Sequence, residues 1–263
     1  FPILKIVFYL VVKECFELEK IDRICSLYES GVSAKQLGLK FSIDKRRIQK
    51  WVKERGILRD KNSSHRFTNF NQNIFDSIDC EEKAYWLGFF YADAYNCDIT
   101  NTFSLSIKDD DYDHLVKLCK FIGLSSSKIK RYIAKINDKE YAACTLRIYS
   151  KHICNKMIEL GCPRAKSFVI TFPGWLDKTL YSHFIRGLFD GDGCITYNAN
   201  NDSWKWSLVS TKECCESIQN IINNELGFKL KYTCISNTNS NTYEFQQLGN
   251  KKVLQLFYNY III

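Results

Sequence analysis

The sequence predicts an α+β protein made of two pseudo-symmetric αββαββα repeats, preceded by a small all-α domain. An apolar helical segment that ends in an aspartate occurs twice, at residues 84–95 and 184–195. The segments that follow the two copies show the same order of strand and helix patterns. The two aspartates, Asp93 and Asp192, are 99 residues apart. The all-α domain is predicted from short, capped amphipathic helices near the N-terminus.

Composition and charge limit the classes of protein to which the chain can belong. With 263 residues and 46% hydrophobic residues, the chain can bury a sizeable core and is not of disordered composition. The net charge is +8, and residues 32–61 hold ten lysines and arginines against three acidic residues. Nearly all the excess charge therefore lies near the N-terminus, where it favours a polyanionic partner and disfavours a purely structural scaffold.

The twelve cysteines follow no regular framework, and the closest pair is the adjacent Cys214–Cys215. We expect reduced, mostly buried thiols and no structural zinc site. This pattern favours a reducing intracellular compartment and leaves organelle, nucleus and viral host open.

Residues 1–19 are apolar and then charged, and we assign them no domain. The apolar run FPILKIVFYLVV is too short to span a bilayer and lacks a signal-peptide cleavage site, so we expect no membrane partner. The chain does not begin with methionine and contains only Met157, which suggests a fragment or a read-through reading frame.

Residues 20–58 are predicted to form a helix-turn-helix module. A first helix over 21–30 is followed by a second capped by Ser33 and a third capped by Ser42. Such a module places its last helix in the DNA major groove; the alternative is a solvated basic face on a three-helix bundle. The candidate DNA-binding residues on this last helix are Lys45, Arg46, Arg47, Gln49, Lys50 and Lys53. Residues 59–78, polar and without helical period, are predicted to be a linker.

The two motif helices carry the predicted catalytic chemistry. A capping box of Asp79 and Glu82 predicts the start of the first helix. Small residues four positions apart let the two helices approach closely, which would bring Asp93 and Asp192 together. The small residues are Gly88 and Ala92 in the first helix and Gly187 and Gly191 in the second. Facing carboxylates are costly unless cations bind between them, and oxygen ligands favour Mg²⁺. The alternative is that each aspartate merely ends a buried helix.

The repeats are predicted over residues 79–165 and 166–263. In the first, the strand after Asp93 is placed at 103–108, followed by a helix at 110–122, strands at 128–136 and 140–149, and a helix at 151–160. In the second, strands at 194–198 and 204–210 precede a helix at 212–226, strands at 228–235 and 242–248, and a helix at 250–260. Each sheet would pack one face on helices and leave the other polar. Strand cations on the polar faces are candidate DNA contacts or plain solubility charges: Arg147, Lys205, Lys229 and Lys231.

The two motifs, WLGFFYADA and IRGLFDGDG, resemble those of single-chain LAGLIDADG homing endonucleases over roughly residues 75–260. The resemblance implies a monomer whose two sheets form a saddle over a long, asymmetric double-stranded DNA site. It also implies that Asp93 and Asp192 hold Mg²⁺, or another divalent cation such as Mn²⁺, and that both strands are cut with short 3′ overhangs. Ala94 departs from the motif's usual glycine, which affects the helix exit but spares the acid.

The same resemblance suggests a catalytic lysine. Lys166, in the segment ahead of the second motif, is the proposed residue. The resemblance gives no match for a second lysine, for which Lys205 or a residue beyond the present end could serve. The chain shows no intein splicing signature, so an intron-encoded or free-standing enzyme is expected. Two rival functions share the fold: an RNA maturase that binds intron RNA, and a DNA-binding protein that has lost cleavage.

Overall fold

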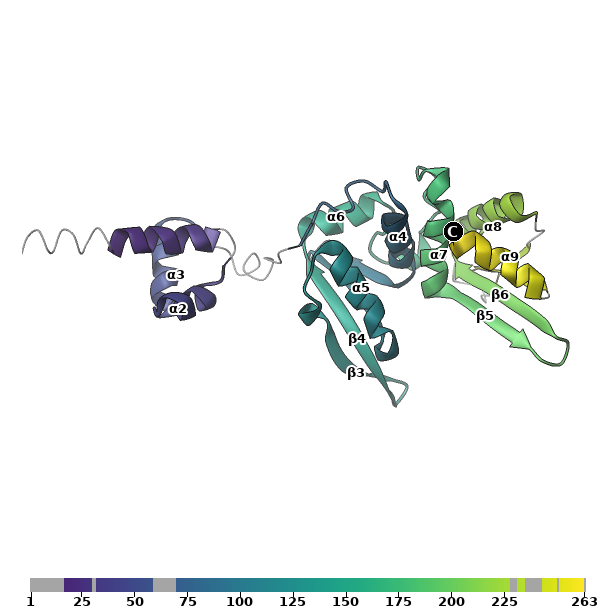
Figure 1. Ribbon diagram of the computed structural model, residues 1–263, viewed down its shortest axis with the longest axis horizontal. Helices are drawn as coiled ribbons and strands as arrows, with labels where there is room; N and C mark the ends of the chain where they lie inside the picture. The colour runs from purple at the N-terminus through teal and green to yellow at the C-terminus, as the bar shows by residue number, and fades with distance from the viewer. Residues whose placement is uncertain are drawn as a thin grey trace, which may run out of the picture. The chain divides into compact units, whose positions relative to one another are not determined.

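The computed structural model describes residues 17–29, 32–58, 70–227, 231–234, 243–249 and 251–262 (Figure 1). The chain divides into two compact units, Phe1–Thr68 and Asn69–Ile263, which are treated separately below. In the described part of the chain, no helix is both long and apolar enough to cross a membrane. Ten cysteines in the described part of the chain are free thiols.

The N-terminal unit is a small helical bundle with its own core. A helix over residues 17–29 precedes α2 (Ala34–Phe41) and α3 (Lys45–Glu54). Each helix contributes fully buried apolar side chains, among them Ile24, Leu37 and Ile48. The three predicted helices are therefore present, and the described part of the first extends four residues further toward the N-terminus than predicted.

The helix caps of this unit agree with the sequence at one position and differ at another. Ser33 caps α2 through a capping box with Gln36, as predicted for this serine. The prediction that Ser42 caps α3 is wrong, because Asp44 accepts the hydrogen bond from the Arg46 amide. Ser42 instead ends α2 with φ 55°, the left-handed conformation that glycine usually supplies.

The second unit contains two copies of one αββαββα order, which confirms the predicted fold class. The first copy is α4 (Glu81–Asp93), β1 (Ala94–Cys97), β2 (Thr102–Lys108), α5 (Tyr112–Ile122), β3 (Lys130–Ile136), β4 (Lys139–Tyr149) and α6 (Lys151–Glu159). The second is α7 (Tyr181–Asp192), β5 (Gly193–Asn198), β6 (Ser203–Ser210), α8 (Lys212–Leu226), β7 (Lys231–Cys234), β8 (Tyr243–Gly249) and α9 (Lys251–Ile262). Short 3₁₀ turns, η1 (Asp109–Asp111) and η3 (Lys166–Phe168), connect elements of this unit.

Each copy forms one four-stranded antiparallel sheet, with strand orders β1-β2-β4-β3 and β5-β6-β8-β7. Figure 1 shows α5 lying across the first sheet and α9 beside β6 in the second. The strand directly after Asp93, β1, was missed by the sequence analysis. It has only four residues, and a polar residue, Asn96, occupies a buried position, so the apolar alternation that predicts a strand is absent.

One face of the first sheet packs against helices and the other is open. In β2, Phe103 and Leu105 are buried, whereas Ser104 between them is part-exposed and Ser106 is exposed. Because side chains alternate along a strand, the serines lie on the helix-free face. Cross-strand partners share a face, so the register extends this helix-free face across the sheet.

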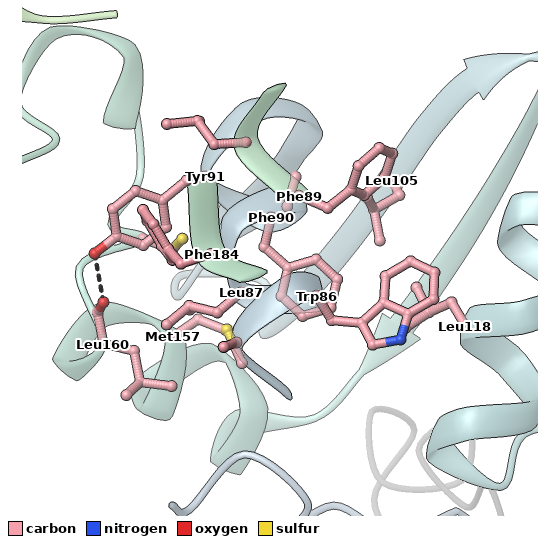
Figure 2. Packing of buried hydrophobic residues seen from close by; sticks show 14 of the residues in the cluster. Trp86, Leu87, Phe89, Phe90, Tyr91, Leu105, Leu118, Met157, Leu160 and Phe184 are labelled. Atoms are coloured by element: carbon pink, nitrogen blue, oxygen red, sulfur yellow. Dashed lines mark hydrogen bonds between the residues drawn. The ribbon is translucent and has the colours of Figure 1, made fainter. Parts of the chain in front are cut away.

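The core of the second unit is continuous across both repeats. Figure 2 shows aromatic side chains of α4 packed among residues of the first sheet and helices, with Trp86 and Phe90 close to Leu118 and Leu105. Tyr91 is buried as well, and its hydroxyl donates a 2.6 Å hydrogen bond to the Leu160 carbonyl. Burial of these large side chains holds α4 in a fixed position on the first sheet.

The start of α4 differs from the predicted capping box. Cys80 occupies the N-cap position and makes no side-chain capping bond. Asp79 instead pairs with Lys83 at 2.8 Å and accepts a 2.6 Å hydrogen bond from Ser77. The Asp79 carboxylate therefore binds the side chains of Ser77 and Lys83, and the prediction of an Asp79–Glu82 capping box is wrong.

Candidate active site at the ends of the two motif helices

The two motif helices, α4 and α7, touch backbone to backbone at paired glycines. A Cβ atom added to Gly88 would overlap the carbonyl oxygen of Phe184, three residues before Gly187. A Cβ atom added to Gly187 would overlap the carbonyl oxygen of Tyr85, three residues before Gly88. The contact is therefore reciprocal, as expected for two helices related by a pseudo-twofold axis.

The second pair of small residues brings the ends of the helices together. A Cβ atom added to Gly191 would overlap the Cβ of Ala92 and lie 3.1 Å from Oδ2 of Asp93. The Asp93 carboxylate thus lies against the last turn of α7, the turn that ends at Asp192. This geometry places a carboxylate from each repeat at the same end of the helix pair.

Both carboxyl groups have raised pKa values. Burial raises the pKa of Asp192 to about 6, and repulsion from Asp93 adds to this effect while Lys166 opposes it. Burial also raises the pKa of Asp93; Lys166 lowers it and Asp111 raises it. Asp192 keeps an exposed surface, so water still reaches it, but the surrounding protein and the second acid disfavour its charged form.

Lys166 is buried beside both acids. Its side chain is 8% exposed, and its Nζ donates a 2.5 Å hydrogen bond to the carbonyl of Ala92. Burial lowers the pKa of Lys166, while Cys162, Asp192 and Asp93 raise it. The lysine therefore ties the turn η3 to the end of α4 and places positive charge near the two carboxylates.

A groove of about 950 Å³ opens beside Asp93. Part of its wall is the helix-free face of the first sheet, with Ser106, Lys108, Tyr132 and Tyr141. Further walls come from the end of α7 and from η1, including Asp110 and Asp111. The acids make this groove unfavourable for a bare phosphate, so cations would be needed for a nucleic-acid backbone to approach Asp93.

The two sides of the helix pair differ in chemistry. On one side, the hydroxyl of Tyr85 donates a 2.6 Å hydrogen bond to Asp190 and lies 3.2 Å from Nε2 of His114. The positions related by 99 residues are Phe184 and Tyr91, whose rings meet edge to face with centroids 5.0 Å apart. One side of the motif pair is therefore polar and the other aromatic.

Comparison with known proteins assigns part of the chain to a family. Residues 179–261 match the family model described as a LAGLIDADG-like domain. The chain carries a LAGLIDADG-like domain. The resemblance predicted from the two motifs to LAGLIDADG homing endonucleases is thereby confirmed.

Solved structures give more distant similarities. Full-length DUF199/WhiA from Thermatoga maritima is 16% identical with a TM-score of 0.46; the match covers 73% of this chain and 60% of that one. The homing endonuclease I-WcaI, bound to its DNA recognition sequence, is 17% identical with a TM-score of 0.48 over 70% and 82% of the two chains. Mesophilic variants of I-DmoI are 16% identical with a TM-score of 0.44 over 68% and 93%. Similarity this distant assigns no function to the present chain, and no curated protein matches it.

The acids of the LAGLIDADG motifs suit a hard divalent cation. Asp93 and Asp192 supply carboxylate oxygens, and their raised pKa values mean that a cation between them would relieve an unfavourable charge state. Among the described residues, no group of three or more histidines, cysteines and acids could hold a metal ion. Mg²⁺ is commonly bound by one or two carboxylates, with water and phosphate oxygens as its remaining ligands. The two aspartates therefore fit a Mg²⁺ site.

The predicted strand cations have different environments. Arg147 is exposed on the helix-free face of β4, opposite Ser104. Lys205 lies on the helix-free face of β6, but its ammonium pairs with Glu244 at 3.2 Å, which reduces its charge toward a ligand. Lys231 begins β7, whereas Lys229 lies outside the described residues.

The predicted DNA-binding residues of α3 are all exposed, and two of them have local partners. The guanidinium of Arg47 stacks over Trp51, 5.0 Å from the ring centroid, and Lys50 pairs with Glu54 at 3.8 Å. The remaining members of the set are free of such partners among the described residues: Lys45, Arg46, Gln49 and Lys53. They form one charged surface opposite the buried Ile48.

Sequence analysis missed the polar network on one side of the motif helices. Tyr85 and Asp190 are 105 residues apart, so no local pattern connects them. The available signal was a break in the repeat. Polar Asp190 stands where the first copy has Tyr91, and Tyr85 stands where the second has Phe184.

Proposed function

We propose that this protein is a site-specific endonuclease that cuts both strands of DNA with a divalent cation held by Asp93 and Asp192. One observation carries the proposal: the paired glycines and Ala92 bring one carboxylate from each repeat to the same end of the helix pair. The raised pKa values of both acids support a cation there. The substrate would be a long asymmetric duplex bound by a monomer.

The proposed reaction is phosphodiester hydrolysis. Water adds to phosphorus, the bond to the 3′ oxygen breaks, and a proton passes to that oxygen to give a 3′-hydroxyl and a 5′-phosphate. A bound Mg²⁺ or Mn²⁺ would supply Lewis-acid polarisation of the phosphate and a lower pKa for water. Asp93 and Asp192 would hold the cation, and their carboxylates would have to lose their protons for this role.

Lys166 serves this reaction through charge and position. Its ammonium is held by the Ala92 carbonyl and lies in the field of both acids. There it would stabilise negative charge that develops on the phosphate, because its geometry is fixed before the substrate binds. A second catalytic lysine is left unassigned, since Lys205 is engaged by Glu244.

The N-terminal unit would add affinity for the same DNA. The exposed basic surface of α3 follows a tight turn, an arrangement that suits insertion of α3 into the major groove as a helix-turn-helix. Contacts from this surface to phosphates would be sensitive to salt. We further propose an intron-encoded or free-standing gene product in a reducing compartment, which the free thiols support.

A second candidate function is RNA binding in the manner of a maturase. The helix-free face of the first sheet exposes four tyrosines: Tyr95, Tyr132, Tyr141 and Tyr149. Exposed aromatic rings on a sheet are suited to stacking on unpaired bases. Binding of single-stranded RNA in preference to duplex DNA would favour this candidate.

The test is cleavage of a randomised duplex DNA library in Mg²⁺, followed by sequencing of the new ends. Wild-type protein is expected to produce recurrent double-strand cuts at one long site, and Asp192→Asn is expected to lose them. Asp98→Asn, an exposed turn residue, is the matched control and should cut like wild type. Tight binding of duplex without cuts by the wild type would replace the proposal with a cleavage-inactive DNA-binding protein.

A further inference from the structure

Arg147 lies on the helix-free face of the first sheet, in register with the strand that follows Asp93. Tyr95 lies two residues after Asp93 and pairs with Ser104, and Ser104 pairs with Arg147 on the next strand. These three residues form one row across β1, β2 and β4. Neighbouring strands are about 4.8 Å apart, so Arg147 lies about 10 Å across the sheet from Tyr95.

The second sheet has the same row with a different third residue. Cys194 lies two residues after Asp192 and pairs with Ser207, and Ser207 pairs with Gln246. The row crosses β5, β6 and β8 in the order in which the first row crosses β1, β2 and β4. Gln246 is therefore the pseudo-symmetric counterpart of Arg147.

Arg147 faces away from the helices, and the register places Gln246, which is part-exposed, on the corresponding face of the second sheet. The neighbours of Arg147 along β4, Leu146 and Ile148, are buried, while Arg147 is exposed. The described residues give Arg147 no ion pair, in contrast to Lys205, which Glu244 engages. The groove beside Asp93 is lined by this same face of the first sheet, and each row starts two residues after its motif aspartate.

The two side chains prefer different bases. Arginine makes paired hydrogen bonds to O6 and N7 of guanine, whereas glutamine makes paired hydrogen bonds to N6 and N7 of adenine in the major groove. The middle members of the rows, Ser104 and Ser207, are the same residue type and discriminate weakly. A difference in base preference between the two half-sites would therefore arise at the third position of each row.

We infer that Arg147 and Gln246 read symmetry-related base pairs on opposite sides of the cut, Arg147 selecting guanine and Gln246 selecting adenine. This inference rests on the proposed function, because it requires that duplex DNA lies on the helix-free faces of both sheets. It makes the asymmetry of the target a consequence of one exchanged residue pair. A good paired contact of this kind gives about a 5- to 150-fold preference over other bases.

The experiment is selection of binding sites from a random duplex library with the full chain carrying Asp93→Asn and Asp192→Asn, which prevents cutting. Selected sites are expected to hold guanine in one half and adenine at the matched position of the other. Adding Arg147→Gln should change the guanine to adenine, and adding Gln246→Arg should change the adenine to guanine. The two together should exchange the half-sites.

Two further variants separate recognition from folding. Arg131→Gln makes the same chemical change on the helix-covered face, where Arg131 pairs with Asp109 at 2.8 Å, and should leave base preference unchanged. Arg147→Lys keeps the charge but lacks the paired donors, so it should weaken the guanine preference while preserving stability. If the protein selects sites whose bases do not change with Arg147→Gln or Gln246→Arg, the inference is overturned and the proposed function still stands. Failure of every variant to select any duplex would overturn both.

Discussion

The two sides of the motif-helix pair share one backbone contact and differ in their side chains. Gly88 and Gly187 make reciprocal contacts with the opposite helix, as symmetry requires. On one side of these contacts Tyr85 donates to Asp190, and on the other Tyr91 packs against Phe184. The close approach of the backbones therefore needs symmetric glycines, while the surrounding side chains are free to diverge.

The divergence follows solvent access. Tyr85, Asp190 and His114 line a cavity of about 780 Å³ along the polar side, where water can hydrate them. Tyr91 is buried on the aromatic side, and its hydroxyl needs the Leu160 carbonyl. A polar pair at the first position costs little, whereas an unpaired hydroxyl at the second would be costly.

The largest effect is expected at the symmetric contact. Gly88→Ala and Gly187→Ala should each destabilise the second unit by about 3 kcal/mol or more, because the added methyl group meets a backbone carbonyl that cannot rotate away. Denaturant unfolding measures the change in free energy. The two losses should be similar. Gly174→Ala, with open space around the added carbon, is the control and should change stability little.

A smaller, unequal effect is expected at the tyrosines. Tyr91→Phe should lower the free energy of unfolding by about 1–3 kcal/mol, because it leaves the buried Leu160 carbonyl without its donor. Tyr85→Phe, which copies Phe184, should cost less than about 1 kcal/mol, since Asp190 is exposed and takes water instead. Chemical denaturation measures both changes. Equal losses of unfolding free energy for the two variants would contradict the difference in solvent access between the two sides.

The smallest effect concerns pH. The folded-state pKa of Asp192 is raised from 3.8 to about 6, so the folded chain holds its proton more tightly than the unfolded chain. Stability without divalent cations should therefore decrease as pH rises from about 4 to about 6, and remain lower above that. Asp192→Asn should remove this part of the slope, and Asp98→Asn should not.

Thermal melting in a chelator across this pH range measures the slope. Added Mg²⁺ should raise the melting temperature of wild type above pH 6 more than that of Asp192→Asn, because the cation binds the deprotonated folded form. A wild-type melting temperature that rises steadily from pH 4 to 7 in the chelator, more than that of Asp192→Asn, would contradict the raised pKa.

Much of the fold could be predicted from periodicity. The motif helices, the strands with apolar alternation such as β2 and β6, and the helix over 212–226 have local patterns strong enough to identify. Predictions that depended on one polar residue were weaker. Asp79 and Ser42 resemble caps in sequence, but Ser77 donates to Asp79 instead, and Asp44 replaces Ser42 as the acceptor of the first amides of α3.

The site was only partly accessible from the sequence. Asp93 and Asp192 stand out because they repeat in register, and their convergence follows from small residues at fixed spacing. The pairing of Lys205 with Glu244 depends on the register of β6 and β8, and the Tyr85–Asp190 bond depends on how two helices cross. Such contacts join residues distant in sequence, so no local pattern contains them.

The most direct test of a shared site is strand-resolved cleavage of one target duplex, with each strand labelled separately. Wild type, Asp93→Asn, Asp192→Asn and the double variant would be compared in Mg²⁺. If both carboxylates serve one site, each single replacement should slow cutting of both strands by at least about 100-fold, and the double variant should be little worse. A double variant that still cut both strands, or single variants that each spared one strand, would contradict a site built from both repeats.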